Sequence, residues 1–238
     1  MVQALKLPVL DLWSGSKSAT QVWADAGHEI ISVDIDESSN PTICKDILNV
    51  DVAELEALAP DGFAFAWASV DCRIYSLMNM RWARHWDVRN NRAYPATQEA
   101  IDANARLVWT LHLLQSVKTP YWVVENPRAM MRQQPFMKAL HRETVCYCKY
   151  GDDRMKPTDL FGNLPPSFVG QMCKNSSASC HHRSAPRGSR SGTQGMAQGE
   201  AQRVPIDLSR IMRDSCIHSD GNQRFTLKDY ENEVLKLD

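Results

Sequence analysis

The sequence lacks the features that mark membrane proteins and the commonest nucleotide-binding loops. No apolar run in its 238 residues approaches the roughly 20 residues that a transmembrane helix needs. No cleavable signal pattern precedes the first apolar segment, and neither Gly-x-Gly-x-x-Gly nor Gly-Lys-Ser/Thr occurs. We therefore expect a cytoplasmic protein without a membrane partner, and both glycine-rich phosphate loops are excluded.

An excess of one charge is also lacking. Lys and Arg total 27 against 28 Asp and Glu, which gives a formal net charge of -1. This balance excludes a uniformly basic nucleic-acid coat but is compatible with a local basic patch. Seven cysteines without an export signal favour free thiols, metal ligands or a nucleophile over a disulfide framework.

Hydrophobic periodicity predicts one α/β domain. Apolar runs end in polar residues at 7–12, 28–36, 62–68 and 121–127, and helical spacing occurs at 19–26, 52–58 and 97–117, the last capped by Thr97. Strands that alternate with helices indicate a parallel sheet, because parallel strands need crossover connections. A further helical pattern begins near Val204, behind Pro205.

Polar groups follow the predicted strands at the edge where open α/β sheets bind ligands. They are Asp11 to Ser18, Asp34 with Asp36, Ser69 to Cys72, and Glu125 to Pro127. A small-residue turn lets a cofactor approach the backbone, and an acid after the second strand can accept hydrogen bonds from ribose hydroxyls. These residues indicate an adenosyl ligand, although a turn that serves packing alone explains them about equally well.

Taken in order, these segments resemble the motifs of the DNA cytosine-5 methyltransferases, and most of all the compact, phage-type members. The resemblance rests on Asp11 to Gly15, Asp34 with Asp36, Asp46-Ile47, Cys72, Glu125 to Pro127, Lys156 to Asn163, Ala185 to Gly195 and Arg203 to Leu208. It implies a Rossmann-like class I S-adenosylmethionine-dependent methyltransferase with a mixed, mostly parallel sheet and a small irregular subdomain. It also implies that the protein acts in the cytoplasm of a bacterial or phage-infected host cell.

The implied activity is transfer of a methyl group from S-adenosylmethionine to carbon 5 of cytosine in DNA. Carbon 5 is a poor nucleophile until a thiolate adds at carbon 6, so Cys72 would form the covalent adduct. Glu125 would be the acid that stabilises the adduct at ring N3. A cytosine in duplex DNA would have to be flipped out of the stack to reach these groups.

The resemblance also implies the binding residues. The cofactor residues are Asp11, Leu12, Trp13, Ser14, Gly15, Ser16, Ser18, Asp34, Ile35, Asp46, Ile47 and Ser69. The substrate residues are Asp71, Asn126, Pro127, Arg187 and Arg190, of which the two arginines lie in a basic, glycine-rich stretch suited to phosphates.

Two departures from the family keep other functions open. Val70 and Asp71 stand where the family has proline before the cysteine, and a neighbouring carboxylate raises the pKa of a thiol. The stretch from Thr158 to Arg203 is too short for the usual target-recognition domain. One alternative is a pyrimidine C5-modifying enzyme that acts on a nucleotide or a modified base. The other is a non-catalytic DNA-binding protein on a methyltransferase scaffold.

A second cluster has the residue types of a structural zinc site. The candidate ligands are Cys148, Cys173, Cys180 and His181, with His182 as the alternative to His181. The competing interpretation is that Cys146 and Cys148 alternate on a strand, one of them packed as a small hydrophobe.

The sequence predicts three parts of the chain. They are a core over 1–145, a loop-rich, DNA-contacting subdomain over 146–203, and a returning helix with a polar tail over 204–238. Two interpretations are open for Trp82, Trp86 and the arginines 81, 84, 89 and 92. They form a DNA-facing surface, or the tryptophans belong to the core and the arginines to a solvated face.

Overall fold

The computed structural model describes residues 6–76, 85–89, 92–174, 180–182, 200 and 202–219. Within these ranges, seven strands form one sheet in the order β3-β2-β1-β4-β7-β9-β8, and two more form a separate hairpin. The sheet strands are β1 (Val9–Leu12), β2 (Ile30–Asp34), β3 (Ile43–Cys44), β4 (Phe65–Ser69), β7 (Trp122–Pro127), β8 (Arg142–Cys146) and β9 (Pro157–Asn163). The hairpin strands are β5 (Trp86–Arg89) and β6 (Arg92–Pro95).

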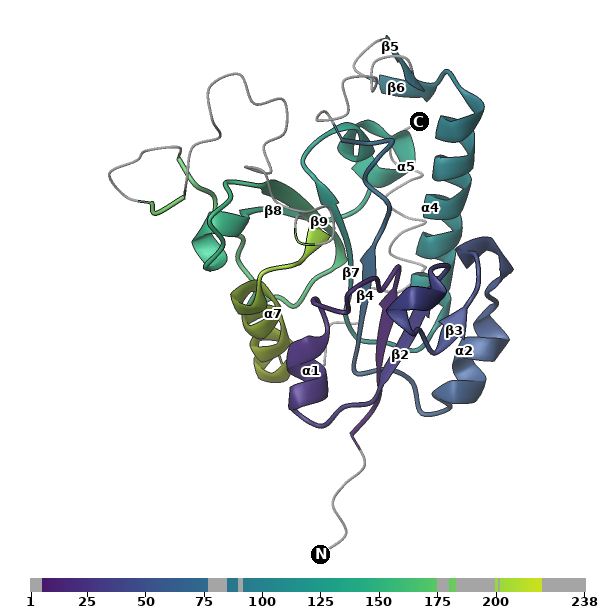
Figure 1. The fold of residues 1–238 in the computed structure, drawn as a ribbon, viewed down its shortest axis with the longest axis vertical. Helices are drawn as coiled ribbons and strands as arrows, with labels where there is room; N and C mark the ends of the chain where they lie inside the picture. Colours follow the sequence, from purple (N-terminus) through teal and green to yellow (C-terminus); the bar gives the residue numbers. More distant parts are fainter. Residues whose placement is uncertain are drawn as a thin grey trace, which may run out of the picture.

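The helices surround this sheet (Figure 1). They are α1 (Gln21–Asp25), α2 (Val52–Leu58), α4 (Gln98–Ser116), α5 (Pro135–Lys138) and α7 (Ile206–His218), with short 3₁₀ turns η1 (Glu37–Ser39), η2 (Ile47–Asn49), η3 (Met130–Gln133) and η4 (Tyr147–Tyr150). None of the helices in the described ranges has both the length and the apolar character that crossing a bilayer requires.

The sheet is mixed and mostly parallel. Strands β3, β2, β1, β4 and β7 pair in parallel, whereas β9 runs antiparallel to both β7 and β8. This order and direction confirm the expected Rossmann-like fold of the class I methyltransferases. The carboxyl ends of β1, β2, β4 and β7 consequently meet at one edge, where ligands of such sheets bind.

Alternating side chains give the sheet two apolar faces, because successive strand residues point to opposite sides. Leu10 and Leu12 pack with residues of α2 and α4 on one face, while Val9 packs with residues of α1 and α7 on the other. Figure 1 shows these helix pairs on opposite sides of the sheet. Trp23 of α1 stacks on Phe65 with ring centroids 5.3 Å apart. Replacing either ring with alanine would cost about 3–5 kcal/mol.

Most predicted elements up to residue 127 are confirmed. Helix α2 has the bounds expected from its periodicity, and α4 begins after Thr97, whose hydroxyl accepts a hydrogen bond from the Ala100 N–H at 3.4 Å. Strand β9 was not expected, and it places part of the stretch 146–203 inside the central sheet. Its Gly162 has φ +135°, and a Cβ there would lie 2.4 Å from the Trp122 carbonyl oxygen. Glycine therefore permits β9 to pair with β7. In the sequence, however, a glycine is more typical of a loop than of a strand interior.

Candidate active site

The turn after β1 has an unusual backbone. Trp13 and Lys17 have φ near +59° and +56°, and Gly15 has φ +42°. Non-glycine residues in this region cost of order 1–3 kcal/mol each and concentrate at ligand sites. Two hydrogen bonds hold the turn: the Ser14 N–H donates to the Val33 carbonyl at 3.1 Å, and the Trp13 indole N–H donates to the Thr110 hydroxyl at 3.1 Å.

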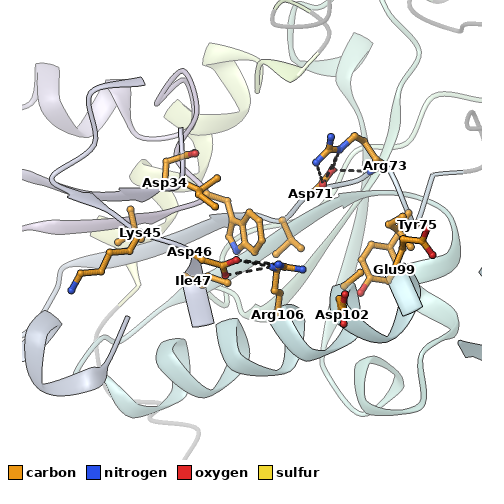
Figure 2. Close-up of a pocket in the computed structure, with 16 residues that line it drawn as sticks. Asp34, Lys45, Asp46, Ile47, Asp71, Arg73, Tyr75, Glu99, Asp102 and Arg106 are labelled. Carbon is orange, nitrogen blue, oxygen red and sulfur yellow. Dashed lines mark hydrogen bonds and ion pairs between the residues drawn. The ribbon is translucent and has the colours of Figure 1, made fainter. Parts of the chain in front are cut away.

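A pocket of about 450 Å³ opens beside this turn, which is within the usual size range of small-molecule sites. Its lining contains five of the predicted cofactor residues: Trp13, Asp34, Ile35, Asp46 and Ile47. The other predicted cofactor residues, which are Asp11, Leu12, Ser14, Gly15, Ser16, Ser18 and Ser69, do not line it. Figure 2 shows Asp34 and Lys45 at one end of the pocket and Tyr75 and Glu99 at the other.

Two acids, Asp34 and Asp36, lie at and just beyond the end of β2, and the structure gives them different surroundings. Asp34 lines the pocket and accepts hydrogen bonds from the N–H groups of Gly15 at 2.7 Å and Asp36 at 2.9 Å. Asp36 instead caps η1, and the Ser38 hydroxyl and N–H hold the pKa of its carboxyl below the ordinary value. Of the two acids that the sequence left open, Asp34 is the one at the pocket.

The apolar and charged walls of the pocket fit an adenosyl group. Asp46 is paired with Arg106, whose Nη2 lies 3.0 Å from Oδ2. Burial by itself raises the pKa of Asp46, but the Arg106 hydrogen bond and the Leu48 N–H together hold it below the ordinary value. Ile35 is 63% exposed although it lines the pocket. A planar, partly apolar ligand would cover Ile35, and the carboxylates would accept its hydroxyl and amino hydrogens.

Asp11 lies beneath the turn, in the middle of β1. Burial raises the pKa of its carboxyl to about 7, while the Thr20 hydroxyl donates to Oδ2 at 2.6 Å. Its Oδ1 and the Ser14 hydroxyl are buried with no hydrogen-bond partner among the described residues. Buried polar atoms without a partner are rare and need a cause, such as a missing ligand or a water.

Cys72 lies at the ligand-binding edge, beyond β4. The last residue of β4, Ser69, pairs in register with Glu125 of β7. The Asn126 side-chain N–H donates to the Val70 carbonyl at 2.9 Å, and the Ser76 N–H donates to the Cys72 carbonyl at 2.8 Å. These contacts fix the chain on both sides of the half-buried thiol, next to the strand that carries Glu125.

The electrostatic surroundings of Cys72 favour the neutral thiol. Burial is the main cause that raises its pKa, and the carboxylates of Glu125 and Asp71 raise it further. The ammonium of Lys156 acts in the opposite direction. Arg73 forms a two-pronged ion pair with Asp71, and its positive charge offsets the negative charge of this acid beside the thiol.

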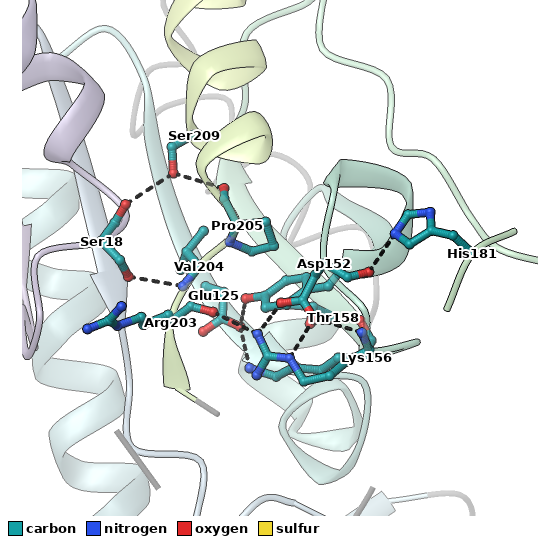
Figure 3. A network of polar contacts seen from close by, with 12 residues as sticks. Ser18, Glu125, Asp152, Lys156, Thr158, His181, Arg203, Val204, Pro205 and Ser209 are labelled. Carbon is teal, nitrogen blue, oxygen red and sulfur yellow. Dashed lines mark hydrogen bonds and ion pairs between the residues drawn. The ribbon is translucent and has the colours of Figure 1, made fainter. Parts of the chain in front are cut away.

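Glu125 is buried, with 6% of its surface exposed, and its partners lie between the antiparallel strands β8 and β9 in the chain. The Tyr147 hydroxyl donates to Oε1 at 2.8 Å, and Lys156 Nζ lies 3.7 Å from the same oxygen (Figure 3). Burial and then Glu125 raise the pKa of Tyr147 well above its ordinary value, so Tyr147 stays a donor. Tyr147 was not predicted as a site residue, because its contact with Glu125 depends on the pairing of β9 with β7.

A cluster of thiols lies next to Tyr147. The ligand atoms of Cys148, Cys173, Cys180 and His182 all lie within 4.8 Å of one another. The predicted ligand His181 is absent from this group, because its Nε2 lies 3.1 Å from the Asp152 carbonyl oxygen instead. The structure thus selects His182 of the two histidines. Cys146 is buried beside Met172, outside the cluster, as expected for a packed thiol.

Some predicted nucleic-acid contacts fall outside the described residues. These are Arg187 and Arg190, together with Trp82 and the arginines 81 and 84. Trp86 is buried and stacks on Tyr75 with centroids 5.6 Å apart, so it belongs to the core. Arg89 pairs with Asp87 on the surface. Pro127 ends β7 beside Thr158 of β9, away from the lining of the pocket.

No protein-family model matches the sequence, and no curated protein matches it. Among solved structures, the chain is similar to the Entamoeba histolytica methyltransferase EhMeth, with 14% identity, a TM-score of 0.48, and coverage of 72% of this chain and 57% of that one. It is also similar to a mutant of Spodoptera frugiperda DNMT2, with 13% identity, a TM-score of 0.45, and coverage of 72% of this chain and 56% of that one. For the S. pombe Dnmt2 methyltransferase the identity is 13%, the TM-score 0.45, and the coverage 69% of this chain and 52% of that one.

This chain therefore spans little more than half the length of the three solved chains. Likeness at these identities and TM-scores does not assign an activity, so the function has to rest on the site itself.

Proposed function

We propose that this chain transfers a methyl group from S-adenosylmethionine to carbon 5 of cytosine in DNA through a Cys72 adduct at carbon 6. The observation that carries the proposal is that Cys72 follows β4 while Glu125 lies in the adjacent strand β7, both beside the pocket that follows β1 and β2. A nucleophile, a carboxyl group and an adenosyl-sized pocket at one sheet edge are the parts that pyrimidine C5 methylation needs.

Cys72 supplies the attacking group. Addition of its thiolate to carbon 6 moves an electron pair to carbon 5, which then attacks an electrophilic methyl group; loss of the carbon 5 proton finally expels the thiolate. Because burial and two carboxylates raise the pKa of Cys72, the reaction needs Lys156 beside the thiol. Lys156 favours the anion, because its positive charge lowers the pKa of the thiol.

Glu125 supports the pyrimidine ring. Its carboxyl group would hydrogen-bond ring N3, which stabilises the ring while the thiolate adds. Tyr147 and Lys156 hold Oε1 from the protein side, so the carboxyl is fixed before substrate arrives. Fixed groups of this kind cost no reorganisation during the reaction.

The pocket residues would hold the methyl donor. S-adenosylmethionine supplies a methyl group on a positively charged sulfur, which is the electrophile that the reaction needs. Asp34 would accept hydrogen bonds from the ribose hydroxyls, Ile35 and Ile47 would contact the adenine, and Asp46 would accept from its amino group. The partnerless Asp11 Oδ1 and Ser14 hydroxyl lie below the turn that would face the amino-acid portion.

DNA is the preferred substrate because the basic stretch that contains Arg187 and Arg190 can neutralise phosphates while a base is flipped. A nucleotide or modified-base substrate would use the same thiol chemistry. A non-catalytic DNA-binding protein would need only the basic stretch. The three functions make different predictions for one trapping experiment.

The test combines the protein, labelled S-adenosylmethionine and duplex DNA that contains 5-fluorocytosine, which blocks loss of the carbon 5 substituent. We expect a denaturation-resistant, labelled protein–DNA adduct for the wild type and none for Cys72→Ser. Cys44→Ser is the matched control, because Cys44 is an exposed thiol at the end of β3, and it should form the adduct normally. DNA binding without adduct or label transfer would overturn the enzymatic function. In a parallel sample with free cytosine nucleotides in place of DNA, label transfer to the nucleotides but not to DNA would overturn the DNA substrate.

A further inference from the structure

Three thiols and one imidazole from separate stretches of chain meet outside the proposed active site. Cys148 belongs to η4, Cys173 lies after β9, and Cys180 and His182 lie further along the chain. All four ligand atoms lie within 4.8 Å of one another. Three cysteines and one histidine are a common ligand set of structural zinc sites, in which four protein ligands leave no position for substrate.

The separations fit a tetrahedral ion. With Zn–S near 2.3 Å and Zn–N near 2.0–2.1 Å, tetrahedral ligands stand about 3.6 Å apart for sulfur and nitrogen and about 3.8 Å apart for two sulfurs. Cys173 Sγ lies 3.7 Å from His182 Nδ1. Since no pair of ligand atoms exceeds 4.8 Å, a contraction of about 1 Å at most would close the group around an ion.

The chain after Phe168 buries little apolar surface near the cluster. Within the described part of 169–182 no helix or strand occurs, and Val169 and Met172 are 71% and 40% exposed. Ordering a segment costs of order 1–2 kcal/mol per residue, which apolar burial offsets elsewhere in the fold. A segment that buries so little apolar surface gains most from a metal, because metal binding contributes its free energy to folding.

The two adjacent histidines have separate contacts. His182 faces the thiols, whereas His181 Nε2 lies against the Asp152 carbonyl oxygen (Figure 3). Asp152 in turn pairs with the buried Arg154, whose Nη2 donates to the Arg203 carbonyl at 3.3 Å. One histidine therefore joins the segment to the cluster and the other joins it to the network under α7.

We propose that Cys148, Cys173, Cys180 and His182 bind one structural Zn²⁺ ion that holds residues 171–174 and 180–182 to η4. Cys148 directly follows Tyr147, whose hydroxyl donates to Glu125. The ion thereby also fixes the partner of Glu125. The proposed metal site does not depend on the proposed methyl transfer. Only the role of the ion in fixing the partner of Glu125 rests on that proposed function.

Metal content tests the ligand set. The wild type, expressed with added zinc and purified without chelator, should contain about one zinc ion per chain by mass spectrometry of the metals. Cys173→Ser and His182→Ala should lose most of this zinc. His181→Ala and Cys216→Ser are the matched controls and should keep it. A wild type without stoichiometric zinc would overturn the site, and so would retention of zinc in both ligand variants.

Two measurements on the wild type remain decisive if a ligand variant does not fold. Cobalt substitution should give the intense visible bands of a tetrahedral thiolate site, and their absence from a cobalt-loaded sample would contradict the geometry. Removal of zinc should speed hydrogen exchange at 146–152 and 171–174, while β1 and β4 stay protected. Unchanged exchange in both segments would refute the structural role. Neither measurement uses methyl transfer, so failure of the zinc site is distinguishable from failure of the proposed enzyme.

Discussion

The Asp71 carboxylate and the Arg73 guanidinium form a forked ion pair next to Cys72. Arg73 Nε lies 3.0 Å from Oδ1 and Nη2 lies 2.7 Å from Oδ2, and the Arg73 N–H also donates to Oδ1 at 3.0 Å. The Arg73 side chain is 74% exposed and the Asp71 side chain 33% exposed, so the pair adds little to the stability of the fold. Its consequence is local: it offsets a negative charge beside the thiol.

The reactivity of Cys72 should follow the charges around it. Asp71→Asn removes a carboxylate that raises the pKa of Cys72, so the thiolate fraction at pH 8 should increase and alkylation by iodoacetamide should become severalfold faster. Lys156→Gln removes the ammonium that lowers this pKa, so alkylation should become severalfold slower. The measurement is the rate of Cys72 modification against pH by peptide mass spectrometry.

The exposed thiol of Cys44 serves as an internal standard in each sample, since it lies on β3, away from both substituted positions. Its rate should not change. Equal Cys72 rates in all three proteins would contradict the electrostatic account, as would rates that move in the same direction for both variants.

Sequence periodicity was sufficient for β1, β2, β4 and β7 because local signals determine these parallel strands, whereas the two-residue strand β3 was not predicted. The run 52–58 carries its own helical pattern and cap, and Asp11 and Asp34 lie within or at the end of the apolar runs that form β1 and β2. The partners of the site needed information that is not local. Tyr147 reaches Glu125 only because β9 inserts between β7 and β8, and Gly162 permits that pairing while reading as a turn residue.

The sequence could not predict which of two neighbouring residues of one type faces a site. Asp34 and Asp36 have the same chemistry and lie at and just beyond the end of the same strand, and His181 and His182 are adjacent. Which member of each pair faces a site depends on contacts with distant residues, namely Gly15 for Asp34 and Cys173 for His182. Periodicity assigns a face only within a regular element, and both pairs lie at or beyond the end of one.

The two acids after β2 should differ in their effect on cofactor affinity. Asp34→Asn weakens an acceptor that lines the pocket, so the affinity for S-adenosylmethionine should fall by about tenfold or more, the effect of losing about 1.4 kcal/mol. Asp36→Asn changes an acid that caps η1 outside the lining, and the affinity should change less than threefold, or about 0.6 kcal/mol. Isothermal titration calorimetry measures both. A larger loss in Asp36→Asn would place the ribose elsewhere.

Asp11 should make stability depend on pH. Its pKa is raised from 3.8 to about 7 in the folded protein, so the folded chain holds a proton that the unfolded chain has released between these values. The contribution to stability is full below pH 3.8 and is lost as the pH rises to about 7. The loss sums to about 4 kcal/mol, from about 1.4 kcal/mol per pKa unit.

Asp11→Asn removes the titration but keeps an acceptor for the Thr20 hydroxyl. Urea unfolding from pH 4 to pH 8 should therefore give a wild-type stability that declines relative to the variant until about pH 7 and then runs parallel to it. Parallel curves over the whole range would show that Asp11 is charged in the folded protein.

The hydrogen bond from Asn126 to the Val70 carbonyl should contribute both to stability and to the thiol site. Asn126 is fully buried, and its side-chain N–H donates to the Val70 carbonyl. Asn126→Asp removes this donor and leaves a carboxylate facing the carbonyl oxygen. The free energy of unfolding should fall by about 1–3 kcal/mol. Asn163→Asp is the matched control, because it also removes a side-chain N–H from a carbonyl, that of Pro120, but at an exposed position. Its effect should stay within about 0.5 kcal/mol.

The same pair of variants tests the position of Cys72. At a temperature where both variants are folded, Asn126→Asp should form much less of the 5-fluorocytosine adduct than Asn163→Asp, because the chain before Cys72 has lost its tether to β7. Normal adduct yield in a folded, destabilised Asn126→Asp protein would show that β4 alone positions the thiol. In that case Asn126 would act only in folding.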